Sequence, residues 1–294
     1  MSAKTSVLIT GGSGFIGQHL TQVLQKKGYK ISLLDRSDKH VPKGVGLFKG
    51  DVVDRSVVQE AMKGMDYVYH LAGLLGTEEL LYQSAEATKV NVIGALNVME
   101  EAVKNKTKLL LVSKPNPWLN TYSITKEASE KFCMMYRKEF GLKAVIVKWF
   151  SVYGPGQKYV GVQKAVPTFI VRALKGEPLP VFDKGQQTAD FIYVSDAARA
   201  TVMVAESKKA EGEIVEIGTG NELKIINLAK LIIQLTHSKS KIKYETMRKG
   251  EDKNAHVVAD VRLLKRYTSF SLDVDLLSGM KTTVDYYAKL LHIK

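Results

Sequence analysis

Short apolar runs alternate, along the first half of the chain, with segments whose apolar residues recur every three or four positions. The first pattern predicts strands buried on both faces, and the second predicts amphipathic helices. The expected strands are TSVLIT, YKISLLD, GLFKGD, DYVYHLA, KLLLVS and KAVIVKWF. The expected helices cover about residues 15–27, 55–63, 87–104 and 122–140. With right-handed crossovers, this alternation predicts an α/β fold: a Rossmann-type, doubly wound parallel sheet with helices on both faces.

The pattern changes after Phe150, where SVYGPGQ has the glycine and proline content of a loop. Shorter strands (DFIYV, GEIVEI and KIKYE) follow, with helices expected near residues 164–175, 225–236 and 278–292. They predict a smaller mixed α/β lobe that is partly interleaved with the first domain. We expect a larger domain of residues 1–164 and about 187–215, and a smaller lobe of about 165–186 and 216–294.

A glycine-rich segment, TGGSGFIG, joins the first strand to the first helix. Gly11 permits a tight turn, Gly14 lets the backbone approach a diphosphate, and Gly17 lets the helix pack closely on the strand. The helix N-terminus adds free N–H groups and the positive end of the helix dipole. The segment therefore predicts a dinucleotide-binding loop, and the alternative is a glycine-rich turn with no ligand.

An acidic residue, Asp35, ends the second strand, where a carboxylate can accept hydrogen bonds from both hydroxyls of an adenosine ribose. The same charge would repel a 2′-phosphate, so Asp35 favours NAD over NADP. Arg36 beside it argues the other way, because arginine can accept a 2′-phosphate. Asp51 would suit the adenine, or it is a turn or helix-capping aspartate.

Tyr122 and Lys126 lie four residues apart in a predicted helix, so their side chains share one face. A free tyrosine has a pKa of about 10 and is a poor base at neutral pH. A neighbouring ammonium and the positive ring of bound NAD would lower that pKa in a dry cleft, and the phenolate could then take a proton from an alcohol. The alternative is a helix face whose tyrosine and lysine only meet solvent.

The net charge of +13 changes this interpretation little, because the lysines are scattered rather than gathered in one stripe. We expect an anionic small-molecule ligand, and neither nucleic acid nor a membrane as a partner. The single cysteine, Cys133, fits a reducing compartment, and the N-terminal segment lacks the apolar run of a signal peptide. These features predict a cytoplasmic protein. No spacing of histidine and cysteine suggests a metal site.

Taken together, several segments give the chain a resemblance to the extended short-chain dehydrogenase/reductase family, the NAD-dependent epimerase/dehydratase group that acts mostly on nucleotide sugars. The resemblance covers almost the whole length, and the order and spacing of the segments make it specific. The segments are TGGSGFIG, GDVVD, HLAG, NVIGALNVMEEA, YSITK, KWFSVYGPGQ, DFIYVSD, EIGTG and MRKGE.

This resemblance implies roles for individual residues. Tyr122 would be the catalytic base and Lys126 its electrostatic partner. Arg248 would hold the diphosphate of the substrate, with Ser151 and Lys184 as further substrate contacts. The expected cofactor contacts are Gly11, Gly14, Phe15, Ile16, Gly17, Asp35, Arg36, Asp51, Val52, Leu71, Ala72, Gly73, Asn91, Tyr122, Lys126, Phe150 and Val152.

Relatives place a longer segment, with a catalytic Ser or Thr, between the strand ending at Ser113 and the tyrosine, whereas here KPNPWLNT is the whole connection. Three interpretations stay open. The segment is truly short, with Ser113 or Thr121 standing in for the missing hydroxyl; the protein is a catalytically weakened relative; or a disordered loop is missing from the recorded chain. Lys114 or Pro115 occupies the usual position of the catalytic hydroxyl.

Two further departures concern the substrate. Ala189 stands where relatives often carry a phosphate-binding arginine, and Lys148 stands where they carry an arginine that donates in a bidentate way. Dehydratases of the family use an acidic pair beside the catalytic threonine, and SKPNP has no carboxylate. The resemblance therefore implies an NAD-dependent nucleotide-sugar epimerase. The alternatives are a 4,6-dehydratase or reductase, or a non-catalytic dinucleotide sensor or scaffold.

The family also pairs subunits through the tyrosine-bearing helix and the helix before it. The resemblance thus implies a homodimer, and the apolar Met134, Met135 and Tyr136 suit a core or helix–helix contact.

Overall fold

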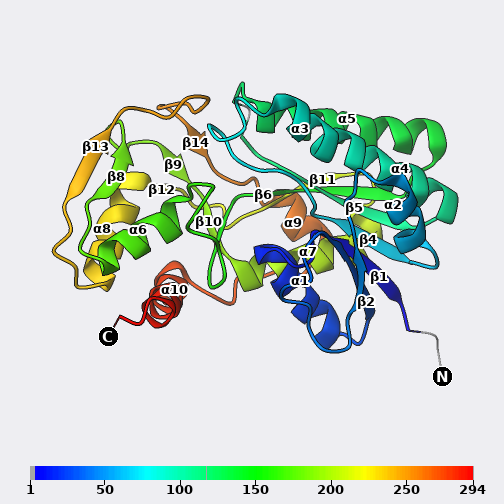
Figure 1. Ribbon diagram of the computed structural model, residues 1–294, viewed down its shortest axis with the longest axis horizontal. Coiled ribbons are helices and arrows are strands. Elements are labelled where there is room, and N and C mark those ends of the chain that lie inside the picture. Colours follow the sequence, from blue (N-terminus) through cyan, green and yellow to red (C-terminus); the bar gives the residue numbers. More distant parts are fainter. Residues whose placement is uncertain (1–3, 117, 294) are drawn as a thin grey trace.

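A parallel sheet of seven strands forms the centre of the protein, which a computed structural model describes for residues 4–116 and 118–293 (Figure 1). The strand order is β11-β6-β5-β4-β1-β2-β3, and every neighbouring pair is parallel. This order, with β1 beside β4 and β2, is the predicted doubly wound topology. The strands are β1 (Ser6–Thr10), β2 (Lys30–Asp35), β3 (Gly46–Lys49), β4 (Tyr67–His70), β5 (Lys108–Ser113), β6 (Ala144–Trp149) and β11 (Ile214–Ile217).

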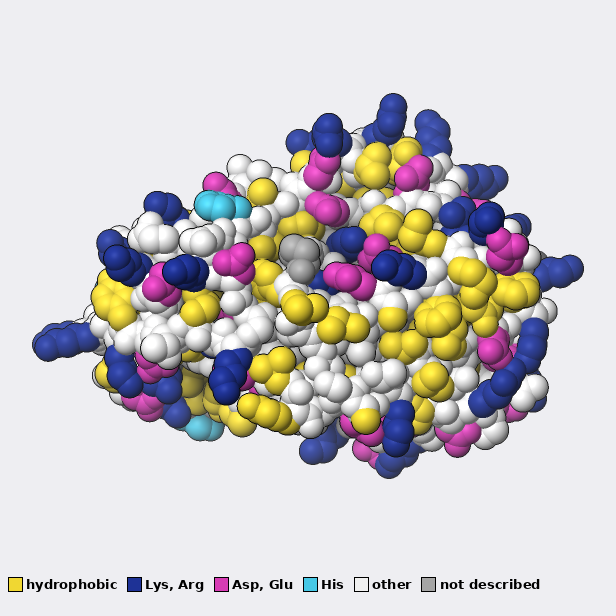
Figure 2. All heavy atoms as spheres, turned by 90° about the horizontal axis from the view of Figure 1, so that it is seen from above, with side chains coloured by type: hydrophobic (Ala, Val, Ile, Leu, Met, Phe, Trp, Pro, Cys, Tyr) yellow, Lys and Arg dark blue, Asp and Glu magenta, His cyan; other side chains and the backbone are white. Residues whose placement is uncertain are grey.

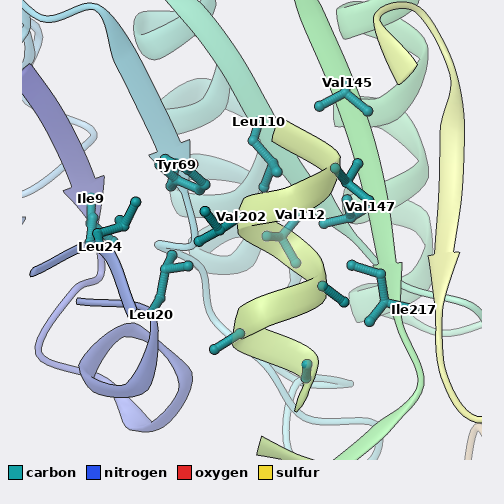
Figure 3. Packing of buried hydrophobic residues seen from close by; sticks show 14 of the residues in the cluster. Ile9, Leu20, Leu24, Tyr69, Leu110, Val112, Val145, Val147, Val202 and Ile217 are labelled. Atoms are coloured by element: carbon teal, nitrogen blue, oxygen red, sulfur yellow. The ribbon is translucent and has the colours of Figure 1, made fainter. Parts of the chain in front are cut away.

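Helices cover both faces of this sheet. One face packs against α1 (Phe15–Lys26), α7 (Val194–Glu206) and α9 (Arg262–Tyr267), and a 3-10 turn follows α7 at Lys208–Ala210. In Figure 3, Val202 of α7 lies beside Leu20 of α1, Tyr69 of β4 and Leu110 of β5. The other face packs against α2 (Arg55–Met62), α4 (Gly94–Asn105) and α5 (Thr121–Phe140). The strands are apolar on both faces because each face has its own helical layer.

A second hydrophobic core lies in the smaller lobe, around helices α6, α8 and α10 and a parallel pair of strands, β8 and β13. Their bounds are α6 (Ala165–Leu174), α8 (Ile225–Leu235), α10 (Leu276–Leu290), β8 (Leu179–Phe182) and β13 (Ile242–Glu245). Two small sheets join this lobe to the first domain, with strands β7 (Ser151–Tyr153), β9 (Thr188–Ala189), β10 (Phe191–Tyr193), β12 (Leu223–Lys224) and β14 (His256–Val257).

The predicted division at residue 215 falls inside β11, which pairs along its whole length with β6. The later helix α9 also packs on the central sheet, through Leu264. Both β11 and α9 thus contact the central sheet, and the division into two domains stays a prediction. The expected boundary divides GEIVEI after Val215, because a short strand carries no local signal for the sheet it joins.

Candidate active site

The phosphate-binding loop predicted between β1 and α1 has the geometry that its glycines require. Gly11 has φ +70°, and a Cβ there would lie 2.9 Å from the backbone N of Ala72. A Cβ on Gly17 would lie 2.6 Å from the carbonyl oxygen of Gly12. Gly14 is the N-cap of α1 and makes no side-chain capping bond, so the helix presents its first N–H groups without an acceptor from the cap. The loop fits a bound diphosphate.

The carboxylate of Asp35 lies at the end of β2, beside this loop. It accepts hydrogen bonds from the backbone N–H groups of Ser13 and Ser37, each at 3.0 Å. A carboxylate has about four acceptor sites, so Asp35 retains two for the hydroxyls of a ribose. Its charge and its position therefore suit NAD.

The neighbouring Arg36 is directed to another acid. Its guanidinium lies 3.7 Å from the carboxylate of Asp51, and its side chain is exposed. Asp51 also accepts the N–H of Val53 at 3.1 Å, which is the turn role considered from the sequence. Val52 is buried against Gly94, so its side chain supports the turn. The charge that argued for NADP is balanced by Asp51.

The end of β4 carries a buried polar chain. The hydroxyl of Thr10 lies 2.8 Å from Nδ1 of His70 and accepts the N–H of Ala72 at 3.2 Å. Burial, helped by the nearby charge of Lys126, lowers the pKa of His70 to about 3, so the imidazole is neutral at physiological pH. This chain fixes the backbone of Leu71 and Ala72 over the glycine loop.

Asn91 links the segment after β4 to α5. It lies in a π-helical turn (Lys89–Ile93) between α3 (Ser84–Thr88) and α4, and is buried. Its side chain bonds both backbone groups of Leu74, at 2.8 and 2.9 Å, and donates to the hydroxyl of Thr125 at 3.0 Å. Ser129 donates to its carbonyl oxygen at 2.6 Å. These bonds use both N–H donors of the amide, which gives Asn91 a supporting position behind the predicted cofactor contacts.

Tyr122 and Lys126 occupy one face of α5, as their spacing predicts. Asn120 begins this helix by accepting the N–H of Ser123 at 2.9 Å. Burial lowers the pKa of Lys126 to about 8, although Glu130 opposes the shift. Burial also raises the pKa of Tyr122 to about 12. Burial by the protein thus favours the neutral phenol. The expectation that Lys126 and the positive ring of bound NAD together lower the tyrosine pKa stays a prediction.

The hydroxyl of Ser113 is held away from the role suggested for it. Ser113 is 3% exposed and donates to Oε2 of Glu130 at 2.9 Å. The other oxygen of Glu130 lies 3.2 Å from the ammonium of Lys148. A catalytic Ser113 would have to exchange its bond to Glu130 for one to the substrate. Glu130 was missed in the sequence, although it follows Lys126 by one helical turn on the same face.

The described residues between β5 and α5, 114–116 and 118–120, include contacts with the helix. Lys114 follows Ser113 and is buried, with its ammonium 3.4 Å from Glu127 on α5. The carbonyl oxygen of Asn116 accepts the hydroxyl of Ser123 at 3.3 Å, which holds the connection against the first turn of the helix. Burial lowers the pKa of Lys114.

The predicted substrate residues fall in different surroundings. Ser151 is exposed on β7, and Phe150 before it is buried. Lys184 is exposed and lines an open groove of about 990 Å³ together with Lys224 and Lys230. Neither Arg248 nor Ala189 lines that groove. The guanidinium of Arg248 lies over the ring of Phe182, 5.9 Å from its centroid.

Arg248 lies at the seam between the lobes, with its side chain 10% exposed. Its Nη2 is 2.7 Å from Glu79 and its Nη1 is 3.0 Å from Glu251. Close by, the side chain of Asn120 donates to the carbonyl oxygen of Gly250 at 2.9 Å. The segment that carries Arg248 is therefore anchored to the first turn of the tyrosine-bearing helix.

Two other kinds of site were sought. Among residues 4–116 and 118–293, no group of three or more His, Cys, Asp or Glu side chains is arranged to hold a metal ion. The same residues contain no helix with the length and apolar content needed to cross a membrane.

Comparison with known proteins identifies the relatives of the chain. The UDP-N-acetyl-alpha-D-glucosaminuronate decarboxylase of Bacillus cytotoxicus is 33% identical over 98% of this chain and 99% of that protein. The UDP-glucose 4-epimerase of Thermotoga maritima, solved with UDP-glucose, is 26% identical and superposes with a TM-score of 0.92 over 98% and 100% of the two chains.

The UDP-glucose 4-epimerase of Thermus thermophilus, solved with NAD, is 25% identical, with a TM-score of 0.88 over 96% and 99% of the chains. Residues 7–218 match the model of the family described as "NAD dependent epimerase/dehydratase family". With its glycine loop, Asp35 and the Tyr122–Lys126 pair in place, the chain belongs to this family of NAD-dependent enzymes that act on nucleotide sugars.

Proposed function

We propose that the protein is an NAD-dependent nucleotide-sugar epimerase that oxidises a sugar carbinol transiently, with Tyr122 as the base. The observation that carries the proposal is the Tyr122–Lys126 pair on one face of α5, with Lys126 buried and Tyr122 half-buried. This helix follows β5 at the carboxyl edge of the sheet that holds the glycine loop and Asp35. Similarity to two UDP-glucose 4-epimerases over nearly the whole chain supports it.

Tyr122 would take the proton of the sugar hydroxyl, and NAD, when bound, supplies the acceptor for the carbinol hydride. Burial holds the tyrosine pKa at about 12. Moving it to neutrality requires about 5 units, or about 7 kcal/mol of preferential phenolate stabilisation. Lys126 can contribute part of this as an ammonium below its pKa of about 8, and the positive ring of the oxidised cofactor must contribute the rest.

Lys126 has a second use in this proposal. In a dry site a charged ammonium stabilises developing negative charge more than it would in water, and a fixed position on the helix avoids reorganisation during the reaction. Asn120 and Asn91 hold this helix at its start and along its buried side. They would therefore act as positioning residues rather than as catalytic ones.

A second candidate reaction is decarboxylation of a nucleotide-linked uronic acid, because the relative with 33% identity is named as such a decarboxylase. Oxidation of a ring carbinol can precede either outcome, so the same Tyr122 and Lys126 serve both. The product separates them: epimerisation conserves the carboxylate or hydroxymethyl group, whereas decarboxylation releases carbon dioxide.

We also infer that the functional unit is a homodimer formed through α4 and α5. Figure 2 shows apolar side chains gathered on the half of the face that carries these helices in Figure 1. Ile124, Phe132 and Met135 recur along α5 at helical spacing and are 52%, 36% and 37% exposed. Burial of such a stripe against its symmetry copy would remove it from water.

The experiment is a product assay with the purified protein and a panel of UDP-, dTDP- and GDP-linked sugars and uronic acids. We expect an epimeric nucleotide sugar from at least one of them, with NAD returned to its oxidised form. Y122F should lose turnover by about 100-fold or more, the usual contribution of a general base, while NAD affinity stays unchanged. Full activity of Y122F would remove Tyr122 from the mechanism.

Two outcomes of the panel would replace the proposal. Carbon dioxide from a uronic acid would establish the decarboxylase instead. Tight NAD binding without turnover of any sugar would favour the sensor or scaffold alternative.

A further inference from the structure

The segment between β4 and α3 reaches across to the smaller lobe through two acidic residues. Glu79 lies 2.7 Å from Nη2 of Arg248, and Glu78 lies 3.5 Å from its Nε. In Figure 1 the cyan segment leading into α3 and the orange segment leading into β14 lie near one another at the top of the molecule. The ion pairs thus join segments about 170 residues apart, one from each lobe.

Every nitrogen of the Arg248 guanidinium already faces a carboxylate. Nη2 contacts Glu79, Nη1 contacts Glu251 at 3.0 Å, and Nε contacts Glu78. A guanidinium binds a phosphate through the same planar fork of N–H groups. A diphosphate that binds the fork formed by Nε and Nη2 must therefore replace Glu78 and Glu79 there.

Glu79 is the partner that matters most for this exchange. Its Oε1 also accepts the N–H of Gln163 at 3.0 Å, just before α6. Its other oxygen is buried and has no hydrogen-bond partner among the described residues. Glu251, in contrast, belongs to the same segment as Arg248 and moves with it, and Glu78 is 44% exposed at a longer distance.

A nearby cation offers Glu79 an alternative partner. Lys164, at the N-cap of α6, interacts with the charges of Glu79, Arg248 and Glu251. Within the described part of the chain it makes no ion pair inside 4 Å. Displaced from Arg248, Glu79 could turn to Lys164 without leaving a buried charge unpaired.

We propose that Glu79 sets the affinity of the enzyme for its substrate, because it occupies the guanidinium of Arg248 and must be displaced by the diphosphate of a nucleotide sugar. The inference rests on the proposed function, which gives Arg248 to that diphosphate. Ala189 stands where relatives often carry a second phosphate-binding arginine. The replacement of Glu79 by the diphosphate at Arg248 therefore contributes more of the substrate affinity than it would with that arginine present. The ligand class is a nucleoside diphosphate, free or linked to a sugar.

The test measures the Kd of UDP by calorimetry for the wild type, E79Q and E78Q, with the full chain and bound NAD. We expect E79Q to bind UDP about tenfold more tightly, which corresponds to about 1.4 kcal/mol. E78Q is the matched control, since the same change is made one residue earlier at the exposed acid, and we expect less than a twofold effect. NAD affinity should be equal in all three proteins.

The double variant E79Q/R248Q isolates the exchange, because the gain from E79Q should vanish when the guanidinium is gone. E79D keeps the negative charge but moves it away from Arg248 by one methylene, so we expect its UDP affinity to lie between those of the wild type and E79Q. UDP binding that E79Q leaves unchanged or weakens overturns the inference alone, since Glu79 would then orient Arg248 for the phosphate. Failure of every protein to bind UDP, dTDP or GDP, with NAD still bound, overturns the proposed function and this inference together.

Discussion

Replacing Lys126 by methionine should stabilise the protein while abolishing its activity. The ammonium is buried, and burial lowers its pKa from 10.5 to about 8. Each pKa unit corresponds to 1.36 kcal/mol, so the folded protein carries a penalty of about 3 kcal/mol wherever the lysine is charged in both states. Methionine has a similar length and no charge, and it removes this penalty.

The sign of the pH dependence follows from the same shift. Between about pH 8 and 10.5 the unfolded chain keeps the Lys126 proton and the folded chain has lost it, so wild-type stability rises with pH across that window. Below about pH 8 Lys126 is charged in both the folded and the unfolded state, so the folded protein carries the full cost of burying its ammonium. The advantage of K126M should therefore be greatest at neutral pH and should disappear near pH 10.5.

The assay is urea unfolding of both proteins, freed of bound nucleotide, at several values between pH 6.5 and 10.5. Comparing the two proteins at each pH cancels the titration of other groups that they share. A stability difference that stays constant with pH would refute the reasoning, because it would come from packing and not from charge. The conservative K126R, which cannot lose its proton, should be less stable than the wild type throughout.

Three other predictions concern the cofactor side. G17A places a methyl group 2.6 Å from the carbonyl oxygen of Gly12. It should lower the free energy of unfolding, measured in urea, by about 1–3 kcal/mol and should weaken NAD binding. Unchanged stability and NAD affinity would contradict the close packing. D35N should lower NAD affinity about tenfold, since a charge-assisted hydrogen bond contributes about 1.5–3 kcal/mol. It should also raise the preference for NADP. An unchanged ratio of the Kd values for NAD and NADP would remove Asp35 from cofactor selection. The pKa of His70 is about 3, so its imidazole should stay neutral in an NMR titration from pH 7 to about 4.5. The contribution of the neutral imidazole to the free energy of unfolding should be complete above about pH 6.5 and should be lost as the pH falls toward 3. Protonation near pH 6 would contradict its burial.

The central sheet could be predicted because its signals are local. Each expected strand in the first half is a short apolar run between turns. The glycines of the loop predict a tight turn, the start of the helix and its close packing on the strand. No local signal predicts the sheet that β11 joins, because only its pairing with β6, far away in the sequence, decides it. The position of α9 likewise depends on a packing contact, which Leu264 makes with the first core.

The sequence predicts which residues form the candidate site, and this set stays a prediction; it does not predict the charge state of each residue. The spacing of Tyr122 and Lys126 places them on one helical face, yet the direction of the tyrosine pKa depends on burial by distant segments. The pairing of Arg248 with Glu79 joins positions 169 residues apart, so no local motif predicts it. Ser113 has the right residue type and strand position, and its partner Glu130 became evident only when α5 was packed on β5.

Asn120 serves two parts of the molecule with the two ends of one amide. Its oxygen caps the helix that carries Tyr122, and its nitrogen donates to Gly250 in the segment that carries Arg248. Any hinge motion that parts the lobes must therefore break the bond to Gly250 or loosen the cap. The Asn120 side chain therefore couples two events: the movement of the segment that would bind the substrate, and the stability of the first turn of the helix that carries Tyr122.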